Sequence, residues 1–126
     1  MANEFETGLN LFGEIYGEQA ATNCRAYAES DSFGSKQAEF AMAWAFGSVW
    51  SREGLERKMR SCVVLGMMIA LRQSDEIYHH TRMALENGLT RGEIEEVLLT
   101  AVPYCGLPAS NVAKAAMQKA FDEIDG

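Results

Sequence analysis

Apolar residues recur at helical spacing along the whole chain, and this pattern constrains the fold most. Phe5, Leu9, Phe12 and Tyr16 stand three or four residues apart, so they share one face of a helix. Residues that favour helices, such as Ala, Met, Leu, Glu and Lys, are frequent, and no segment alternates apolar and polar residues as a strand does. The sequence therefore predicts an all-α fold.

Turn and capping signals divide the chain into a bundle of six to seven helices. These are expected over about 3–16, 19–28, 35–49, 55–72, 74–87, 90–103 and 108–123. Ser74 is expected to cap the fifth helix and Gly88 to follow its end, whereas Thr90 and Glu93 have the spacing of a capping box. Pro103 is expected to kink or end the sixth helix. With 126 residues and no internal repeat or linker, residues 1–126 are expected to form a single domain.

The most apolar segment is the run from Cys62 to Leu71. It has about half the length that a bilayer requires, so it is not expected to span a membrane. A helix that is apolar nearly all round belongs in the centre of a bundle or at a subunit interface. The first residues, Met1 to Glu6, lack the basic and apolar regions of a signal peptide, which predicts a cytoplasmic protein.

The net charge of −7 opposes binding to nucleic acid, because contacts with phosphates need clustered cations. Basic residues do gather locally, as Arg52, Arg57, Lys58 and Arg60. In an acidic protein such a cluster is suited to a small anion. The alternative is a solvated first turn of a helix.

The three cysteines lie far apart and form neither a C-x-x-C motif nor a metal-ligand spacing. No disulfide framework and no metal site are therefore predicted. Cys62 is expected to be a small buried hydrophobic residue, and Cys105, beside a turn, is either structural or reactive.

The second half of the chain contains several blocks in a characteristic order. They are Trp50-Ser-Arg-Glu-Gly-Leu55, Arg60-Ser61, His80 followed eight residues later by Gly88, Gly88-Leu-Thr-Arg-Gly-Glu93, Glu96-Val-Leu-Leu99 and Tyr104-Cys-Gly-Leu-Pro108. Together, over about 75 residues, these blocks resemble the carboxymuconolactone decarboxylase family. The resemblance implies a helical fold like that of alkyl hydroperoxidase D and a homo-oligomer, either a trimer or a hexamer.

Two branches of this fold differ in their chemistry. The alkyl hydroperoxidase D branch uses a C-x-x-C motif with a histidine four residues beyond the second cysteine. Counted back from His80, those positions hold Gln73 and Glu76, so a dithiol mechanism is excluded. The resemblance to the decarboxylase branch implies loss of CO2 from 4-carboxymuconolactone to give 3-oxoadipate enol-lactone, a step of aromatic catabolism.

This reaction needs no cofactor, because the substrate itself accepts the electrons that the departing carboxylate leaves. They spread through a double bond onto the oxygen of the lactone carbonyl. The protein must supply a hydrogen-bond donor for that oxygen, an acid that returns a proton to carbon, and cations that hold the small carboxylate substrate.

His80 is the candidate for the acid or for the donor, because the usual pKa of histidine lies near neutral pH. Taken without the resemblance, a single helical histidine is more often a surface or core residue. His79 points about 100° away around the helix, and we interpret it as peripheral.

Four further residues are candidates for binding the substrate. Arg52 has a guanidinium that can hold a carboxylate through two hydrogen bonds, or it pairs with a neighbouring acidic residue, and Arg60 is a second candidate. Trp50 and Tyr104 are aromatic residues at chain breaks, where they either line a pocket or fill the core.

Two departures from the family pattern bear on the substrate. The decarboxylases carry an early histidine at a position that falls on or near Ala20, and Glu53 replaces a usual proline beside Arg52. Two alternatives therefore stand beside the decarboxylation of 4-carboxymuconolactone. One is an enzyme acting on another lactone, enol or polyketide-like acid, and the other is a non-catalytic oligomeric protein that binds small molecules.

Overall fold

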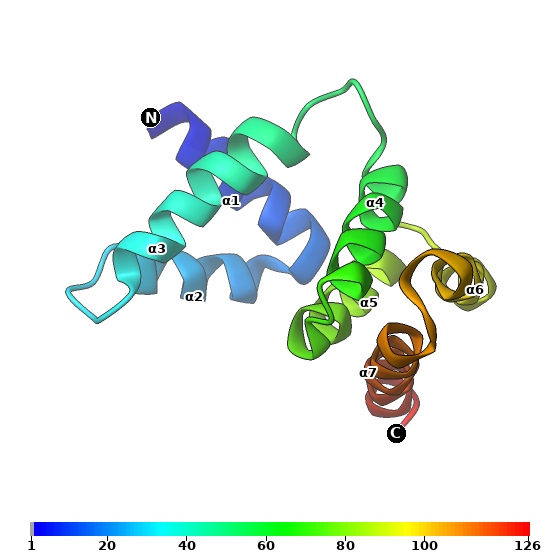
Figure 1. The fold of residues 1–126 in the computed structure, drawn as a ribbon. Coiled ribbons are helices and arrows are strands. Elements are labelled where there is room, and N and C mark those ends of the chain that lie inside the picture. Colours follow the sequence, from blue (N-terminus) through cyan, green and yellow to red (C-terminus); the bar gives the residue numbers. More distant parts are fainter. Residues whose placement is uncertain (1) are drawn as a thin grey trace. The chain divides into compact units, whose positions relative to one another are not determined.

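The computed structural model describes residues 2–126, and this part of the chain contains helices and no strands (Figure 1). It has seven α-helices and one π-helical segment, η1, in the order α1 (Ala2–Tyr16), α2 (Glu18–Ala28), α3 (Ser35–Phe40), η1 (Ala41–Trp50), α4 (Arg57–Ala70), α5 (Ser74–Glu86), α6 (Arg91–Cys105) and α7 (Leu107–Asp125). The predicted all-α class is confirmed. Among the described helices none is long and apolar enough to cross a membrane.

The helices form two compact units. Unit 1 comprises the chain up to Leu55, and unit 2 runs from Glu56 to Gly126. Unit 1 holds α1, α2, α3 and η1, and unit 2 holds α4 to α7. Each unit has its own buried residues, which are described separately below.

In unit 1, α1 packs along η1. Leu9 and Ile15 of α1 are buried, as are Met42 and Trp50 of η1. Phe12 meets the ring of Phe46 edge to face, with 5.5 Å between the ring centroids. The apolar face predicted over residues 5–16 only partly coincides with this contact: Leu9 and Phe12 lie in it, whereas Tyr16 is exposed and Phe5 lines an open cavity.

At the centre of this contact, Gly8 of α1 meets η1 with no side chain between the two backbones. A Cβ atom at Gly8 would lie 1.8 Å from the carbonyl oxygen of Met42, and one at Gly47 would lie 2.0 Å from the carbonyl oxygen of Glu4. Both are backbone atoms, so no rotamer change can make room. Glycine at positions 8 and 47 therefore permits the close approach of the two helices.

The predicted helix over 35–49 changes its hydrogen-bonding pattern at Ala41. Helix α3 continues into η1, in which the backbone N–H of residue i bonds to the carbonyl of residue i−5; the last such bond joins Ser51 to Phe46 at 3.1 Å. The prediction of a helix here is correct, but it missed the π-helical form. The ten residues of η1 are nearly all apolar. The sequence therefore has no regular spacing of polar residues from which the number of residues per turn could be inferred.

In unit 2, α4 packs against α5, α6 and α7. The core includes Leu65 and Ile69 of α4, Ile77 of α5 and Ile94 of α6, all fully buried. The opposite face of α4 is exposed and apolar, with a stripe made of Met59, Val63, Met67 and Leu71. The apolar segment thus buries only one face, and Cys62, expected to be buried, is half-buried against the core.

The helix ends lie within two residues of their predicted positions, but the predicted capping residue of α5 is wrong. The N-cap residue of α5 is Gln73, whose side chain makes no capping hydrogen bond, and Ser74 is the first helical residue. The expected end is correct, because Gly88 follows α5 with a φ of 102°, a conformation that favours glycine. Helix α6 continues through Pro103 to Cys105.

The capping box at the start of α6 is confirmed. The Thr90 hydroxyl accepts a hydrogen bond from the backbone N–H of Glu93 at 3.0 Å, and the backbone N–H of Thr90 donates to the Glu93 carboxylate at 2.9 Å. The same carboxylate lies 3.2 Å from the Lys58 ammonium of α4. Glu93 therefore caps its own helix and also contacts a neighbouring one.

Replacement of Thr90 with alanine is expected to lower the free energy of unfolding by about 1 kcal/mol, because the N–H of Glu93 loses its acceptor. Urea unfolding followed by circular dichroism measures this change. Thr100→Ala is the matched control, since the Thr100 hydroxyl only donates to the Glu96 carbonyl within α6. Equal stability of the two variants would contradict the importance of the cap.

Candidate functional site

His80 lies on α5, in a partly buried position. Its side chain is 22% exposed, and the next residue, Thr81, is fully buried in unit 2. The two ring nitrogens differ. Nδ1 is buried and has no hydrogen-bond partner among the described residues, whereas Nε2 lies 3.6 Å from a carboxylate oxygen of Glu76, one turn earlier. The ring therefore has a buried side and a side that faces an exposed acidic residue.

The surroundings of His80 lower its pKa below the usual value. The main cause is burial, which disfavours the charged imidazolium; the nearby His79 also lowers the pKa, and the Glu76 carboxylate opposes both effects. At pH 7 the ring of the free protein is therefore mostly uncharged. Its imidazolium form is a stronger acid than an ordinary histidine, which suits transfer of a proton to carbon.

His79 is exposed and packs its ring against Tyr78, with 5.0 Å between the ring centroids. On the other side of α5, Tyr78 donates a hydrogen bond to Glu123 of α7, and the Lys119 ammonium lies over its ring. Residues 78 and 79 are thus engaged in contacts on the surface of unit 2. Of the two histidines, His80 is therefore the more buried, since His79 is exposed.

The other two candidate residues of unit 2 differ in exposure. Arg60 is half-buried near the start of α4, in the same turns as Lys58. Tyr104 lies directly after Pro103 near the end of α6, and its side chain is 87% exposed. Tyr104 therefore does not fill the core of unit 2, and its hydroxyl is open to solvent or to a ligand.

Unit 1 carries the remaining two candidates. Trp50, the last residue of η1, is only 8% exposed and stacks on Phe46, with 6.4 Å between the ring centroids. Arg52 is exposed in the segment that follows η1. Within unit 1, Trp50 fills the core, and Arg52 presents its guanidinium at the surface.

The three cysteines are free thiols and only partly buried. Burial raises the pKa of Cys24, so its reactive thiolate form is disfavoured. Cys105 ends α6 and packs against the core of unit 2. In residues 2–126 no group of three His, Cys, Asp or Glu side chains is arranged to hold a metal ion.

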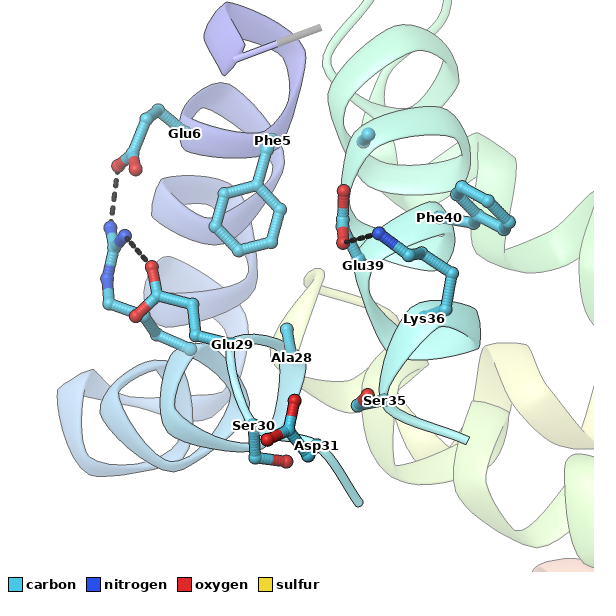
Figure 2. A pocket seen from close by; sticks show the side chains of 12 residues that line it. Phe5, Glu6, Ala28, Glu29, Ser30, Asp31, Ser35, Lys36, Glu39 and Phe40 are labelled. Carbon is cyan, nitrogen blue, oxygen red and sulfur yellow. Dashed lines mark hydrogen bonds and ion pairs between the residues drawn. The ribbon is translucent and has the colours of Figure 1, made fainter. Parts of the chain in front are cut away.

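Sequence reasoning missed an open cavity of about 840 Å³ in unit 1. Phe5, Ala28 and Phe40 line its apolar part (Figure 2). Several charged residues around it form ion pairs: the Arg25 guanidinium lies 2.6 Å from the Glu6 carboxylate and 3.5 Å from that of Glu29. Glu6 and Arg25 are nineteen residues apart, so no local motif could have predicted this pair. None of the five candidate residues lines the cavity.

Comparison with known proteins places the chain in a family. A profile of the carboxymuconolactone decarboxylase family matches residues 37–119. A 4-carboxymuconolactone decarboxylase of Acinetobacter baylyi is 34% identical over 120 residues, which cover 95% of this chain and 88% of that protein. A nitrosuccinic acid decarboxylase of Metarhizium robertsii is 35% identical over 120 residues, covering 95% of this chain and 82% of that protein. The chain therefore belongs to the carboxymuconolactone decarboxylase family.

Proposed function

We propose that this protein decarboxylates 4-carboxymuconolactone to 3-oxoadipate enol-lactone, a step of aromatic catabolism, without a cofactor. The observation that carries the proposal is the match to a decarboxylase of that acid along 95% of the chain. Both relatives are decarboxylases, and the chain is a carboxy-lyase of this family. The non-catalytic alternative is therefore set aside.

In the proposed reaction the bond between the ring carbon and the carboxylate breaks, and CO2 leaves. The electron pair spreads through the double bond to the lactone carbonyl, which becomes an enolate. The carbon next to the lactone carbonyl, at the other end of the double bond from the carbon that lost CO2, then takes up a proton. A positioned acid lowers the barrier of this last step, and a hydrogen-bond donor stabilises the enolate.

His80 is the proposed acid. Its partly buried ring and lowered pKa favour release of a proton from the imidazolium. A bound dicarboxylate would raise that pKa, because a nearby negative charge favours the protonated form. Substrate binding would thus load His80 with the proton that it later donates.

Of the other candidates, Arg52, Arg60 and Tyr104 keep the roles that the sequence suggests, and Trp50 does not. Arg52 is proposed to hold a carboxylate of the substrate, and Arg60 to assist as a second cation. The exposed hydroxyl of Tyr104 supports its role as a hydrogen-bond donor to the substrate. For Trp50, burial in the core of unit 1 favours a supporting role over direct contact.

A second candidate substrate is a different acid that carries its own electron-accepting group. That group would take up the electrons that the departing carboxylate leaves. The relative named nitrosuccinic acid decarboxylase favours this alternative, because its identity to this chain equals that of the first relative within one per cent. The start of α2 favours it too, because the decarboxylases of the resemblance have a histidine at a position that falls on or near Ala20. Enzymes of this family can thus act on acids that carry different electron-accepting groups.

We further propose that the chain acts as one family domain in a homo-oligomer, a trimer or a hexamer, with a fold like that of alkyl hydroperoxidase D. The exposed stripe of Met59, Val63, Met67 and Leu71 on α4 supports an oligomer, since contiguous apolar surface is rare on monomers.

The test of the proposed activity is a direct assay with each acid. We expect micromolar protein to accelerate the loss of enzymatically generated 4-carboxymuconolactone, with one CO2 and one enol-lactone formed for each substrate consumed. Nitrosuccinic acid is assayed in parallel. Turnover of that acid alone would replace the first substrate with the second, and acceleration of neither would contradict both.

A further inference from the structure

Glu76 is placed to act on His80, and this inference rests on the role proposed for that histidine. The two residues stand one turn apart on α5, so their side chains lie on the same face of the helix. The Glu76 carboxylate is 54% exposed, and one of its oxygens lies 3.6 Å from Nε2 of His80. The separation is longer than a hydrogen bond, so the Nε2 hydrogen stays available to a substrate.

The two tautomers of the ring differ in their contact with this carboxylate. An uncharged imidazole carries one hydrogen, on either Nδ1 or Nε2. Nδ1 is buried without a partner among the described residues, so it is unsatisfied in both tautomers, as a donor in one and as an acceptor in the other. A hydrogen on Nε2 lies near the negative charge of Glu76, so the carboxylate favours the tautomer that carries it there.

We propose that Glu76 is a positioning residue for His80, whose carboxylate keeps the ring hydrogen on Nε2 and stabilises the imidazolium that donates the proton. The imidazolium passes its Nε2 proton to the carbon of the enolate and keeps the hydrogen on Nδ1; a proton taken up from solvent on Nε2 then restores the imidazolium. Glu76 keeps its charge throughout, and it does not contact the reacting atoms.

Among the described residues, Glu76 is the carboxylate whose charge acts on His80. His79 opposes protonation of His80. From α7, Glu123 contacts Tyr78 and lies 3.9 Å from Arg82, and Lys119 lies over the ring of Tyr78. At the end of α5, the Ser61 hydroxyl of α4 accepts a hydrogen bond from the Asn87 amide.

The test uses the fact that the chain has only two histidines. In a His79→Gln background, every histidine signal in a long-range ¹H–¹⁵N spectrum comes from His80. We expect Nε2 to carry the hydrogen above the pKa of His80. Adding Glu76→Gln should shift hydrogen towards Nδ1 and lower the pKa of His80 by about 0.5 pH unit, the scale of an exposed ion pair.

Activity should change in a pH-dependent way. Because fewer imidazolium ions remain, kcat/KM of Glu76→Gln should fall about threefold above the pKa of His80, as the 0.5-unit shift requires. Well below that pKa, where both proteins are protonated, the difference should shrink. A merely structural role of Glu76 would lower kcat/KM equally at every pH.

Asp75→Asn is the matched control, because it removes the same charge from the same first turn of α5. It should leave the nitrogen signals and the pKa of His80 unchanged. Equal spectra for Glu76→Gln and Asp75→Asn would overturn the proposal. The spectra are recorded without substrate, so they test the action of Glu76 on His80 even where the proposed decarboxylation itself fails.

Discussion

His80→Gln is expected to lower kcat for the decarboxylated acid by about 10²- to 10⁴-fold, the range that a positioned acid contributes. Glutamine has a size similar to that of histidine and can still donate a hydrogen bond, but it cannot transfer a proton at neutral pH. Loss of activity in this variant therefore isolates proton transfer from mere hydrogen bonding. Steady-state kinetics with the substrate identified in the direct assay measures the change.

The pH profile of the unmodified protein adds a second signature to this prediction. Because burial lowers the pKa of His80, kcat/KM should be higher in acid and fall as the pH rises through a pKa below 6.5. His79→Gln is the control on the same helix, and it should retain both the rate and the sign of the pH dependence. Unchanged turnover by His80→Gln would refute the role of His80.

Gly8→Ala is expected to lower the free energy of unfolding by about 2 kcal/mol. The added Cβ would lie 1.8 Å from the Met42 carbonyl oxygen, so α1 and η1 must separate by more than an ångström. Overpacking of this kind costs up to about 3 kcal/mol, and the higher helix propensity of alanine returns about 1 kcal/mol. The steric cost is therefore the larger of the two effects. Urea unfolding followed by far-ultraviolet circular dichroism measures the difference.

Gly66→Ala is the matched control for the glycine at the helix contact. Gly66 also lies inside a helix, α4, but a Cβ there would have no neighbour within 4 Å. Its replacement should raise the free energy of unfolding by about 0.5–1 kcal/mol through helix propensity alone. Opposite signs for the two variants are expected, and stabilisation by Gly8→Ala would contradict the close contact described here.

Local signals in the sequence were sufficient for the helices but not for their contacts. The capping box at Thr90 and the glycine at position 88 were predicted correctly, because each depends on residues a few positions apart. Ser74 was assigned to the wrong side of a helix boundary, which side-chain preference alone cannot fix to a single residue. The approach of Gly8 to Gly47 joins distant positions, and no local pattern marks it.

The candidate site, too, could be predicted only in part from the sequence. His80 was found from its spacing to Gly88 in the family resemblance, whereas the two different sides of its ring became visible only in the structure. In the sequence, Glu76 is notable only because the alkyl hydroperoxidase D branch has a cysteine at that position. In the structure it stands one turn before His80, so its carboxylate lies close to the His80 ring. This proximity depends on α5 being helical at these residues.

The π-helical segment η1 also makes unit 1 optically distinct. Both tryptophans of the chain, Trp44 and Trp50, belong to η1, and they are 74% and 8% exposed. Tryptophan fluorescence, excited selectively so that the tyrosines do not contribute, therefore reports on unit 1, with one emitter open to acrylamide quenching and the other shielded. Comparison of this emission with circular dichroism, which follows all helices, reveals whether the two units lose their structure in one cooperative step or in two.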